Sequence, residues 1–587
     1  MDYSEVLKKA KDYLEKEKDP YFKNELEELL KKDDEKTKAE LADRFYQNLE
    51  FGTGGLRGII GGGYNRMNTL VVKSATQGLA TYLKKAFPDR AKKEGELSAA
   101  IAYDSRHFST EFAEAAALIF AANGINTYLF TSLRPTPVLS FAIRKLNCDT
   151  GIVVTASHNP PAYNGYKAYW TGGSQVIPPH DKGIIKEVNS VTEILEISRI
   201  EAMDKGLLVM IDKEIDESYY AMVKSRLFRP ELIKEKAKEV KIVYTPLHGT
   251  GAIHVERILG DLGLKVITVP EQREGDGNFP TVAFPNPEEA AAMDMALKLG
   301  IKEKADVVMA TDPDADRFGI AVPNPDKEGD FLLVTGNQTG VLLADYIFHS
   351  LKETGKMPPN PAMVNSVVTT GMQAKVAEYY GAKCFECLTG FKWIAEVMAR
   401  CEKDGSANIV YGTEESYGYL IETEVRDKDG ISAAALTSEM TLYWRSKGLS
   451  LLDRLNQLYA ICGYWEEIGI SKYFQGPEGP AIMQGIMDNY RKSPPVNLGG
   501  IKVSRIRDIK NGVDGLAPSD VLQFFLVDGT IVSARPSGTE PKIKFYATCC
   551  AKLDENVHGK DALKAAREEA GRKLKAIEKD IRSVIGD

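Results

Sequence analysis

The 587-residue sequence predicts an α/β protein with three similar α/β domains that have mixed sheets, followed by a C-terminal α+β domain. A chain of this length exceeds one hydrophobic core and is expected to form roughly three to five domains. A pattern of strand, polar loop, helix, glycine and strand occurs three times along the chain. The final part changes to several strands followed by one long helix, which is typical of an α+β domain.

The three copies of the repeat predict three βαβ crossovers. Their first strands are predicted at 97–103, 240–244 and 362–368, their helices at 112–122, 253–262 and 373–380, and their second strands at 125–130, 265–269 and 383–387. Gly124, Gly263 and Gly381 stand where each helix should end. Because the copies are separated along the chain, they indicate three related domains rather than a solenoid.

The two ends of the chain differ from this repeat. Residues 4–49 are predicted to be helical, with an apolar stripe that begins at Val6, Leu7, Ala10, Tyr13 and Leu14. Near the other end, strands at 521–527 and 530–534 flank Asp528-Gly529, a hairpin signal. A strand at 543–548 and a helix at 561–584 follow. We predict domain boundaries at 1–210, 211–325, 326–455 and 456–587.

The composition argues against several classes of protein. A net charge of −8 disfavours a general nucleic-acid or membrane-surface binder. The N-terminus has no apolar signal-like stretch and no run is long enough for a transmembrane helix, so we expect a cytoplasmic protein. Seven cysteines do not suggest a disulfide framework. The pairs Cys384/Cys387 and Cys549/Cys550 are interpreted as buried thiols rather than as a zinc site.

The first stretch with chemical content is Thr155–Lys167, which reads TASHNPPAYNGYK and follows a predicted strand at 151–154. Ser157 offers a hydroxyl at the end of that strand, where nucleophiles and ligands often lie in α/β domains. Two prolines restrict the loop to few conformations. A polar turn with an ordinary serine is the alternative interpretation.

The second stretch contains Asp312, Asp314 and Asp316 at alternating positions after a predicted strand. Three carboxylates this close repel each other strongly unless a cation lies between them. Oxygen ligands select a hard ion, and the open positions suit Mg²⁺ bound to a phosphate. An exposed acidic turn is the alternative.

Two further loops and a glycine-rich stretch could bind substrate groups. Residues 412–418, GTEESYG, follow a predicted strand at 407–411 and could hydrogen-bond a polyol, although a surface turn is the alternative. Residues 535–540, RPSGTE, lead to Lys542 and Lys544 and could hold a phosphate. Arg57 lies in the glycine-rich stretch 51–63, and arginine suits bidentate phosphate contact.

The four motifs TASHNP, DPDADR, EESYG and RPSGTEP occur in the order found in the α-D-phosphohexomutase superfamily of phosphoglucomutases and phosphomannomutases, which this chain resembles. FGTGGLRG and YDSRHFS resemble the phosphoglucomutase- and phosphopentomutase-like branch. The resemblance implies four domains around a central cleft. It also implies conversion of glucose 1-phosphate to glucose 6-phosphate through phosphoserine and a bisphosphorylated sugar, with phosphopentomutase or phosphomannomutase activity as alternatives.

The resemblance also implies roles for individual residues. Ser157 would carry the phosphoryl group and, with Asp312, Asp314 and Asp316, would bind Mg²⁺. The catalytic group would further contain His158, Lys167, Arg57 and Lys428, although a plain ion pair is the alternative for Lys428. The residues that would bind substrate are Arg106, Arg317, Thr389, Gly390, Lys392, Glu414, Ser416, Arg535, Ser537, Gly538, Thr539 and Lys544.

Phe391 stands where several phosphomannomutases have histidine, which favours glucose. We expect Mg²⁺ and a sugar 1,6-bisphosphate primer as cofactors, a sugar monophosphate as partner, no nucleic-acid or membrane partner, and a monomer or homodimer. A metal-dependent phosphatase and a sugar-phosphate sensor are rival functions. Because water would hydrolyse an exposed phosphoserine, we expect the last domain to act as a lid and the Arg535 loop to move on binding.

Overall fold

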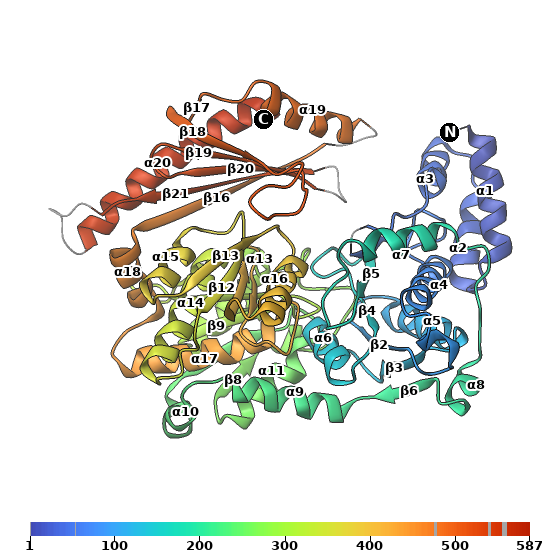
Figure 1. The fold of residues 1–587 in the computed structure, drawn as a ribbon, viewed down its shortest axis with the longest axis horizontal. Helices are drawn as coiled ribbons and strands as arrows, with labels where there is room; N and C mark the ends of the chain where they lie inside the picture. Colours follow the sequence, from blue (N-terminus) through green and yellow to red (C-terminus); the bar gives the residue numbers. More distant parts are fainter. Residues whose placement is uncertain (1, 53, 475–477, 538–541, 554–559, 587) are drawn as a thin grey trace. The chain divides into compact units, whose positions relative to one another are not determined.

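The computed structural model describes residues 2–52, 54–474, 478–537, 542–553 and 560–586 (Figure 1). The chain folds into two compact units. The first unit comprises Met1–Thr335 and Ser416–Leu442, and the second comprises Gly336–Glu415 and Tyr443–Asp587. The short segment Ser416–Leu442 therefore belongs to the first unit, although it lies within the third predicted domain.

The N-terminal segment forms three helices rather than one uninterrupted helix. They are α1 (Tyr3–Lys16), α2 (Pro20–Leu30) and α3 (Glu35–Phe45). The Asp19 side chain accepts a hydrogen bond from Tyr21 N, and that of Asp34 accepts one from Thr37 N. These capping aspartates, and Pro20 in the first turn of α2, start new helices and so break the predicted segment.

The first unit contains a six-stranded mixed sheet in the order β1-β5-β4-β2-β3-β6. Strand β2 pairs in parallel with β3 and β4, whereas β5 is antiparallel to β1 and β4. The strands are β1 (Gly55–Ile59), β2 (Ser98–Tyr103), β3 (Asn126–Phe130), β4 (Thr150–Val154), β5 (Tyr163–Tyr169) and β6 (Leu208–Ile211). The helices around it are α4 (Thr69–Ala86), η1 (Arg90–Lys92), α5 (Ser109–Ala122), α6 (Thr136–Lys145), α7 (His180–Asn189) and α8 (Arg199–Asp204).

The second sheet of the first unit has the order β11-β10-β9-β7-β8 and is also mixed. Strand β7 is parallel to β8 and β9, and β10 is antiparallel to β9 and β11. Its strands are β7 (Lys241–Thr245), β8 (Lys265–Thr268), β9 (Val307–Thr311), β10 (Phe318–Pro323) and β11 (Phe331–Val334). The accompanying helices are α9 (Lys213–Ser225), α10 (Pro230–Lys236), η2 (Ala237–Glu239), α11 (Gly251–Asp261), α12 (Pro270–Arg273) and α13 (Ala290–Glu303).

The second unit begins with a parallel arrangement in which β12 pairs with β13 and β14. These strands are β12 (Pro361–Ser366), β13 (Lys383–Cys387) and β14 (Asn408–Glu414), with helices α14 (Gly336–Glu353), α15 (Met372–Tyr379), α16 (Phe391–Asp404) and α18 (Leu451–Cys462). Strand β14 is longer than predicted and ends at Glu414. The short strand β15 (Gly418–Leu420) and most of α17 (Gly430–Ser446) lie in the segment that belongs to the first unit.

The last domain is an antiparallel sheet in the order β16-β21-β20-β19-β18-β17. Its strands are β16 (Tyr464–Tyr473), β17 (Asn497–Leu498), β18 (Ile501–Asp508), β19 (Leu522–Leu526), β20 (Ile531–Pro536) and β21 (Lys542–Ala551). Helix α20 (Lys560–Ile585) packs on β16 and β21, and α19 (Gly479–Lys492) contacts β20 and β21 (Figure 1). The α+β character and the hairpin at Asp528-Gly529 are confirmed.

The three βαβ crossovers are confirmed, because β2–β3, β7–β8 and β12–β13 are parallel pairs. Gly124, Gly263 and Gly381 have φ values of +74°, +76° and +75°. Glycine adopts this left-handed conformation without the steric cost that a Cβ imposes. The glycines therefore end the three helices as the sequence predicts.

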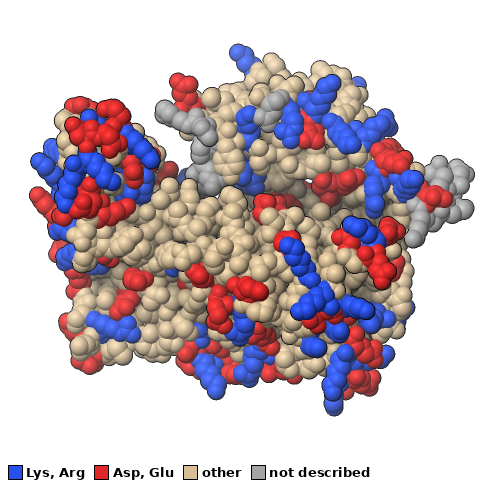
Figure 2. Space-filling view, turned by 180° about the vertical axis from the view of Figure 1, so that it is seen from behind, with Lys and Arg blue, Asp and Glu red and all other residues tan. Residues whose placement is uncertain are grey.

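Charged side chains of both signs share the surface, and the cysteines form no disulfide within the described residues. On the face shown in Figure 2, basic and acidic side chains are interspersed. All seven cysteines are free, with Cys387 and Cys549 buried and Cys384 and Cys550 half-buried. Within the described residues, helices that are both long and apolar enough to span a lipid bilayer are absent.

Candidate active site

The loop that carries Ser157 joins the antiparallel strands β4 and β5 of the first unit. Ser157 is only 4% exposed and has a left-handed φ of +53°, which costs a non-glycine residue about 1–2 kcal/mol. Its Oγ donates a hydrogen bond to Asp312 Oδ2 at 2.8 Å and lies 3.1 Å from His158 Nδ1. The hydroxyl therefore faces the acidic loop of the neighbouring sheet.

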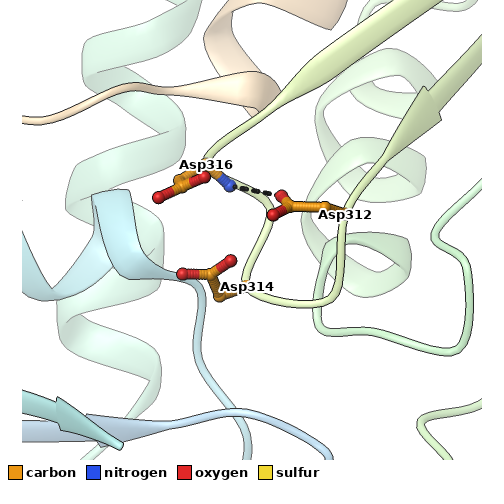
Figure 3. Close-up of side chains that lie close together, drawn as sticks. All are labelled: Asp312, Asp314 and Asp316. Carbon is orange, nitrogen blue, oxygen red and sulfur yellow. Dashed lines mark hydrogen bonds between the residues drawn. The ribbon is translucent and has the colours of Figure 1, made fainter. Parts of the chain in front are cut away.

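The three aspartates of the acidic loop gather between β9 and β10, as Figure 3 shows. Asp312, Asp314 and Asp316 are at most 1% exposed, and one carboxylate oxygen from each lies within 4.8 Å of the others. Asp312 Oδ1 accepts hydrogen bonds from the backbone N–H of Asp316 at 3.1 Å and of Arg317 at 2.9 Å. The sequence prediction that these carboxylates converge is correct, whereas the alternative of an exposed acidic turn is wrong.

The hydrogen bonding of the triad suits a hard cation. Asp314 Oδ1 and Asp316 Oδ1 are buried and have no hydrogen-bond partner. A buried carboxylate oxygen without a partner is costly, which makes two of them beside a serine hydroxyl a fitting set of ligands for Mg²⁺. The residues present therefore match the predicted metal.

Two lysines offset the negative charge of the triad. Lys167 Nζ lies 2.7 Å from Asp314 Oδ2 and 3.1 Å from Asp316 Oδ2, and Lys428 Nζ lies 3.1 Å from Asp316 Oδ2. Burial opposes ionisation of Asp316, but these ammonium groups outweigh it and lower the pKa of the carboxyl. Burial and the charges of Asp314 and Asp316 raise the pKa of Asp312 well above its usual value.

Two arginines lie near the loop that carries Ser157 and His158. Arg57 Nη1 donates to Asn159 Oδ1 at 3.2 Å, and Arg317 has a buried Nε without a hydrogen-bond partner. Burial, followed by the charges of Arg317 and Arg57, lowers the pKa of His158 well below its usual value. The imidazole is therefore neutral at physiological pH, and a phosphate on Ser157 would have cationic neighbours.

Arg106, predicted to bind substrate, is directed at the backbone of the Ser157 loop. Its side chain is fully buried, and its four terminal N–H groups donate to four carbonyl oxygens. The acceptors are Ser157 O and Asn159 O, each at 2.5 Å, Pro160 O at 2.9 Å and Tyr163 O at 3.0 Å.

The predicted sugar-binding residues of the second unit partly converge. Glu414, 4% exposed at the end of β14, accepts a hydrogen bond from Gly390 N at 2.6 Å. Thr389 Oγ1 is buried without a hydrogen-bond partner, and Lys392 Nζ lies 5.7 Å from the centre of the Trp393 ring. The neighbouring Glu415 instead accepts from Ser366 Oγ and Thr369 Oγ1, which ties it to the end of β12.

The predicted phosphate loop is only partly described. Arg535 on β20 and Lys544 on β21 are directly opposite each other, and Ser471 on β16 is opposite Lys544. Ser537 N donates to Lys542 O at 2.7 Å. Gly538 and Thr539 lie outside the described residues. Ser416 belongs to the first unit, whereas Glu414 belongs to the second.

Two residues near the triad and its lysines, Thr136 and Tyr169, make contacts that sequence reasoning missed. Thr136 Oγ1, at the start of α6, donates to Asp314 Oδ2 at 2.7 Å. Asp427 accepts from Tyr169 Oη at 2.6 Å and from Lys428 Nζ at 3.1 Å. The Thr136 and Tyr169 contacts each join segments more than a hundred residues apart, so no local motif reveals them. The Asp427–Lys428 contact joins neighbours and is the ion pair that the sequence offered as the alternative for Lys428.

Comparison with known proteins gives matches over most of the chain. Residues 48–194, 217–327 and 335–461 match the models described as phosphoglucomutase/phosphomannomutase alpha/beta/alpha domains I, II and III. A probable phosphoribomutase of Schizosaccharomyces pombe is 34% identical over 582 residues, covering 94% of this chain and 95% of the relative. A phosphoglucomutase of Staphylococcus epidermidis is 34% identical over 540 residues, covering 89% and 95% respectively.

A solved structure shares the fold at lower identity. The open form of the phosphoglucomutase parafusin from Paramecium has a TM-score of 0.68 at 20% identity, covering 92% of this chain and 96% of that chain.

Proposed function

Because this chain belongs to the phosphoglucomutase/phosphomannomutase family of intramolecular phosphotransferases, we propose that it interconverts glucose 1-phosphate and glucose 6-phosphate through a phosphorylated Ser157. The observation that carries this proposal is the 2.8 Å hydrogen bond from Ser157 Oγ to Asp312 within a buried carboxylate triad. A serine in this setting is oriented and surrounded by charge, which phosphoryl transfer needs more than covalent assistance.

In the proposed cycle, phosphorylated Ser157 gives its phosphoryl group to the free hydroxyl of a sugar monophosphate. The P–O bond to Ser157 breaks as the bond to the sugar oxygen forms, which yields a sugar bisphosphate. The bisphosphate then returns its other phosphoryl group to Ser157 and leaves as the isomeric monophosphate. Arg57 and Arg317 would stabilise the charge on the transferred group.

Asp312, Asp314, Asp316 and an oxygen of Ser157 would hold Mg²⁺, which when bound would neutralise charge on the phosphoserine oxygens. The proton of the attacking sugar hydroxyl needs an acceptor in this chain. His158, a neutral imidazole beside Ser157 Oγ, is the candidate acceptor, whereas Lys167 and Lys428, which are ammonium groups paired with the triad, are the candidates to donate a proton.

Substrate recognition is assigned mainly to the second unit, with Ser416 from the first unit. Glu414, with Thr389 and Gly390 beside it, would hold sugar hydroxyls, and the opposed cations Arg535 and Lys544 would hold the phosphate that is not transferred. Ser416, Lys392, Ser537, Gly538 and Thr539 are proposed to assist. That the four loops close around one cleft stays a prediction.

The test is an assay of glucose 1-phosphate, mannose 1-phosphate and ribose 1-phosphate, each with Mg²⁺ and a trace of sugar bisphosphate. We expect conversion of glucose 1-phosphate that depends on the bisphosphate. No isomerised product from any of the three would refute a mutase. Release of inorganic phosphate without primer would instead support the rival phosphatase, and binding without turnover would support a sensor.

Ribose 1-phosphate is the second candidate substrate, because the Schizosaccharomyces pombe relative is named a probable phosphoribomutase. The Ser157 loop and the triad would bind the phosphoryl group, and they do not determine the ring size of the sugar that is accepted. The ratio of kcat/KM for the glucose and ribose phosphates decides between the two substrates.

A further inference from the structure

The guanidinium of Arg106 has no terminal donor left for a ligand. Four N–H groups on Nη1 and Nη2 donate to the carbonyl oxygens of residues 157, 159, 160 and 163. A lysine could not reproduce this set, because its ammonium has three donors and lacks the planar fork. Arg106 thus binds the carbonyl oxygens of three of the eight residues between β4 and β5, together with that of the first residue of β5.

Asp104 fixes the same loop through a second path. Its Oδ2 accepts from Thr155 Oγ1 at 2.6 Å, and Thr155 Oγ1 accepts from Ser157 N at 2.8 Å. Its Oδ1 accepts from Arg106 N at 2.9 Å and from Ser109 Oγ at 2.8 Å. Two residues that follow β2 therefore fix the backbone of Ser157: Arg106 bonds its C=O directly, and Asp104 holds Thr155, which accepts from its N–H.

The groups around Asp104 and Arg106 are buried and paired. Asp104 is 1% exposed, and its Oδ2 lies 3.3 Å from Arg106 Nε, so each buried charge has a partner. The buried ring of Phe279, from the neighbouring sheet's domain, lies 4.9 Å from the guanidinium carbon. Ser157 also has a left-handed φ, which persists only where its surroundings determine it.

We propose that Arg106 is a positioning residue, held by Asp104, that fixes the Ser157 loop so that the hydroxyl and its phosphate point at the acidic triad. This inference rests on the proposed function of Ser157. It goes beyond that function because Arg106 is proposed to bind the Ser157 loop and not the substrate. Both phosphoryl transfers use the same serine oxygen. A loop that did not hold Ser157 in place would therefore slow the reaction in both directions.

The test uses the full chain with Arg106→Ala and Arg106→Lys. We expect kcat to fall about a hundredfold, the loss typical of a misplaced reacting group, with KM changed less than about threefold. Guanidinium ion added to Arg106→Ala should restore part of kcat, and ammonium ion at the same ionic strength should not. Phosphate occupancy of Ser157, followed by intact mass after addition of glucose 1,6-bisphosphate, should decay faster than in the wild type.

Arg44→Lys is the matched control, because Arg44 is also buried and bonds two carboxylates and a carbonyl far along the chain from the Ser157 loop. It should lower the melting temperature without changing kcat or phosphoserine decay per folded molecule. Should the Arg106 variants not fold, Thr155→Val removes the hydroxyl between Asp104 and Ser157 N at nearly constant volume. It should lower kcat about tenfold with KM retained.

A rise in KM with kcat unchanged would show that Arg106 contacts the substrate and would overturn the proposal. Wild-type kcat in both Arg106→Lys and Thr155→Val would overturn it too. These failures are distinct from failure of the proposed function, in which the wild-type chain itself would show neither mutase activity nor phosphorylated Ser157.

Discussion

Buried carboxylates are costly for a fold, and the chemistry of the triad explains why they are there. Desolvation disfavours the charged form of Asp312 and Asp316, yet the loop places both beside the buried Asp314. Lys167 and Lys428 offset part of this charge, and two oxygens remain without partners. A fold that only needed stability would not retain such a cluster.

Replacing Ser157 by alanine should lower mutase activity by at least about a thousandfold, since the phosphoryl carrier is removed. The fold should remain, because the substitution removes one hydroxyl whose partners are Asp312 and His158. Activity and circular dichroism measured on the same sample test the expected loss of activity and the expected retention of the fold. Wild-type turnover in this variant would exclude the phosphoserine route.

Asp314→Asn should weaken Mg²⁺ binding by at least about tenfold, because a charged ligand becomes neutral at constant shape. Calorimetric titration with Mg²⁺ measures this directly and does not require turnover. The control is Asp294→Asn, an exposed carboxylate paired with Lys298, which should bind Mg²⁺ like the wild type. Equal affinity in all three proteins would place the metal elsewhere.

At the scale of elements, the repeated crossovers place functional loops at the ends of strands. The Ser157 loop follows β4, the acidic loop follows β9, and Glu414 ends β14. A parallel strand pair needs a crossover helix, and the helix must stop so that the chain can return to the sheet. The glycine after each helix supplies that stop.

Gly263→Ala should destabilise the first unit by about 1 kcal/mol, because its φ of +76° penalises a Cβ although the space around it is nearly open. Gly260→Ala, within helix α11 that Gly263 follows, is the matched control. No atom lies within 4 Å of a Cβ there, so alanine should stabilise the helix by about 0.5–1 kcal/mol. Urea denaturation of the two variants should give shifts of opposite sign, and shifts of the same sign would contradict this account.

At the scale of the whole molecule, the second unit packs its last domain on the residues that follow β12. Gln523 Nε2 donates to Val367 O at 2.7 Å, and Val367 and Val368 share a buried cluster with Ile509 and Val521. This contact does not test the prediction that the Arg535 loop moves. Structures with and without sugar phosphate that show the last domain in one fixed pose would contradict it.

Gly371→Ala should loosen this packing, because a Cβ at Gly371 would lie 2.7 Å from the Trp465 ring. We expect a loss of about 1–3 kcal/mol and faster amide exchange along β16. Gly469→Ala, on β16 like Trp465, is the control, since nothing lies within 4 Å of a Cβ at Gly469. Unchanged amide exchange in both variants would show that the contact between Gly371 and Trp465 does not hold the last domain against the residues that follow β12.

Acid should destabilise the first unit through His254. Burial, followed by the charge of Arg134, lowers the pKa of this 1% exposed imidazole from 6.5 to about 3. The unfolded chain therefore binds a proton below about pH 6.5 that the folded protein does not, so the stability is present above that pH and is lost as the pH falls. Between pH 7 and pH 5 the loss is about 2 kcal/mol.

His254→Asn, which can keep a hydrogen bond to Tyr220, should flatten this pH dependence. Melting temperatures of both proteins across pH 5–7 measure the difference. The same slope in wild type and variant would assign the acid sensitivity to other groups.

The sequence by itself determined the repeat of βαβ crossovers, the antiparallel last domain, and the loops that hold Ser157, the aspartates and Glu414. These features depend on local periodicity and on residue types that suit one kind of chemistry. Only the tertiary structure decided that Lys428 contacts Asp316, that Thr136 contacts Asp314, and that Arg106 holds the Ser157 loop. Such contacts join segments far apart in the chain, so they depend on how sheets and loops pack, which no local pattern encodes.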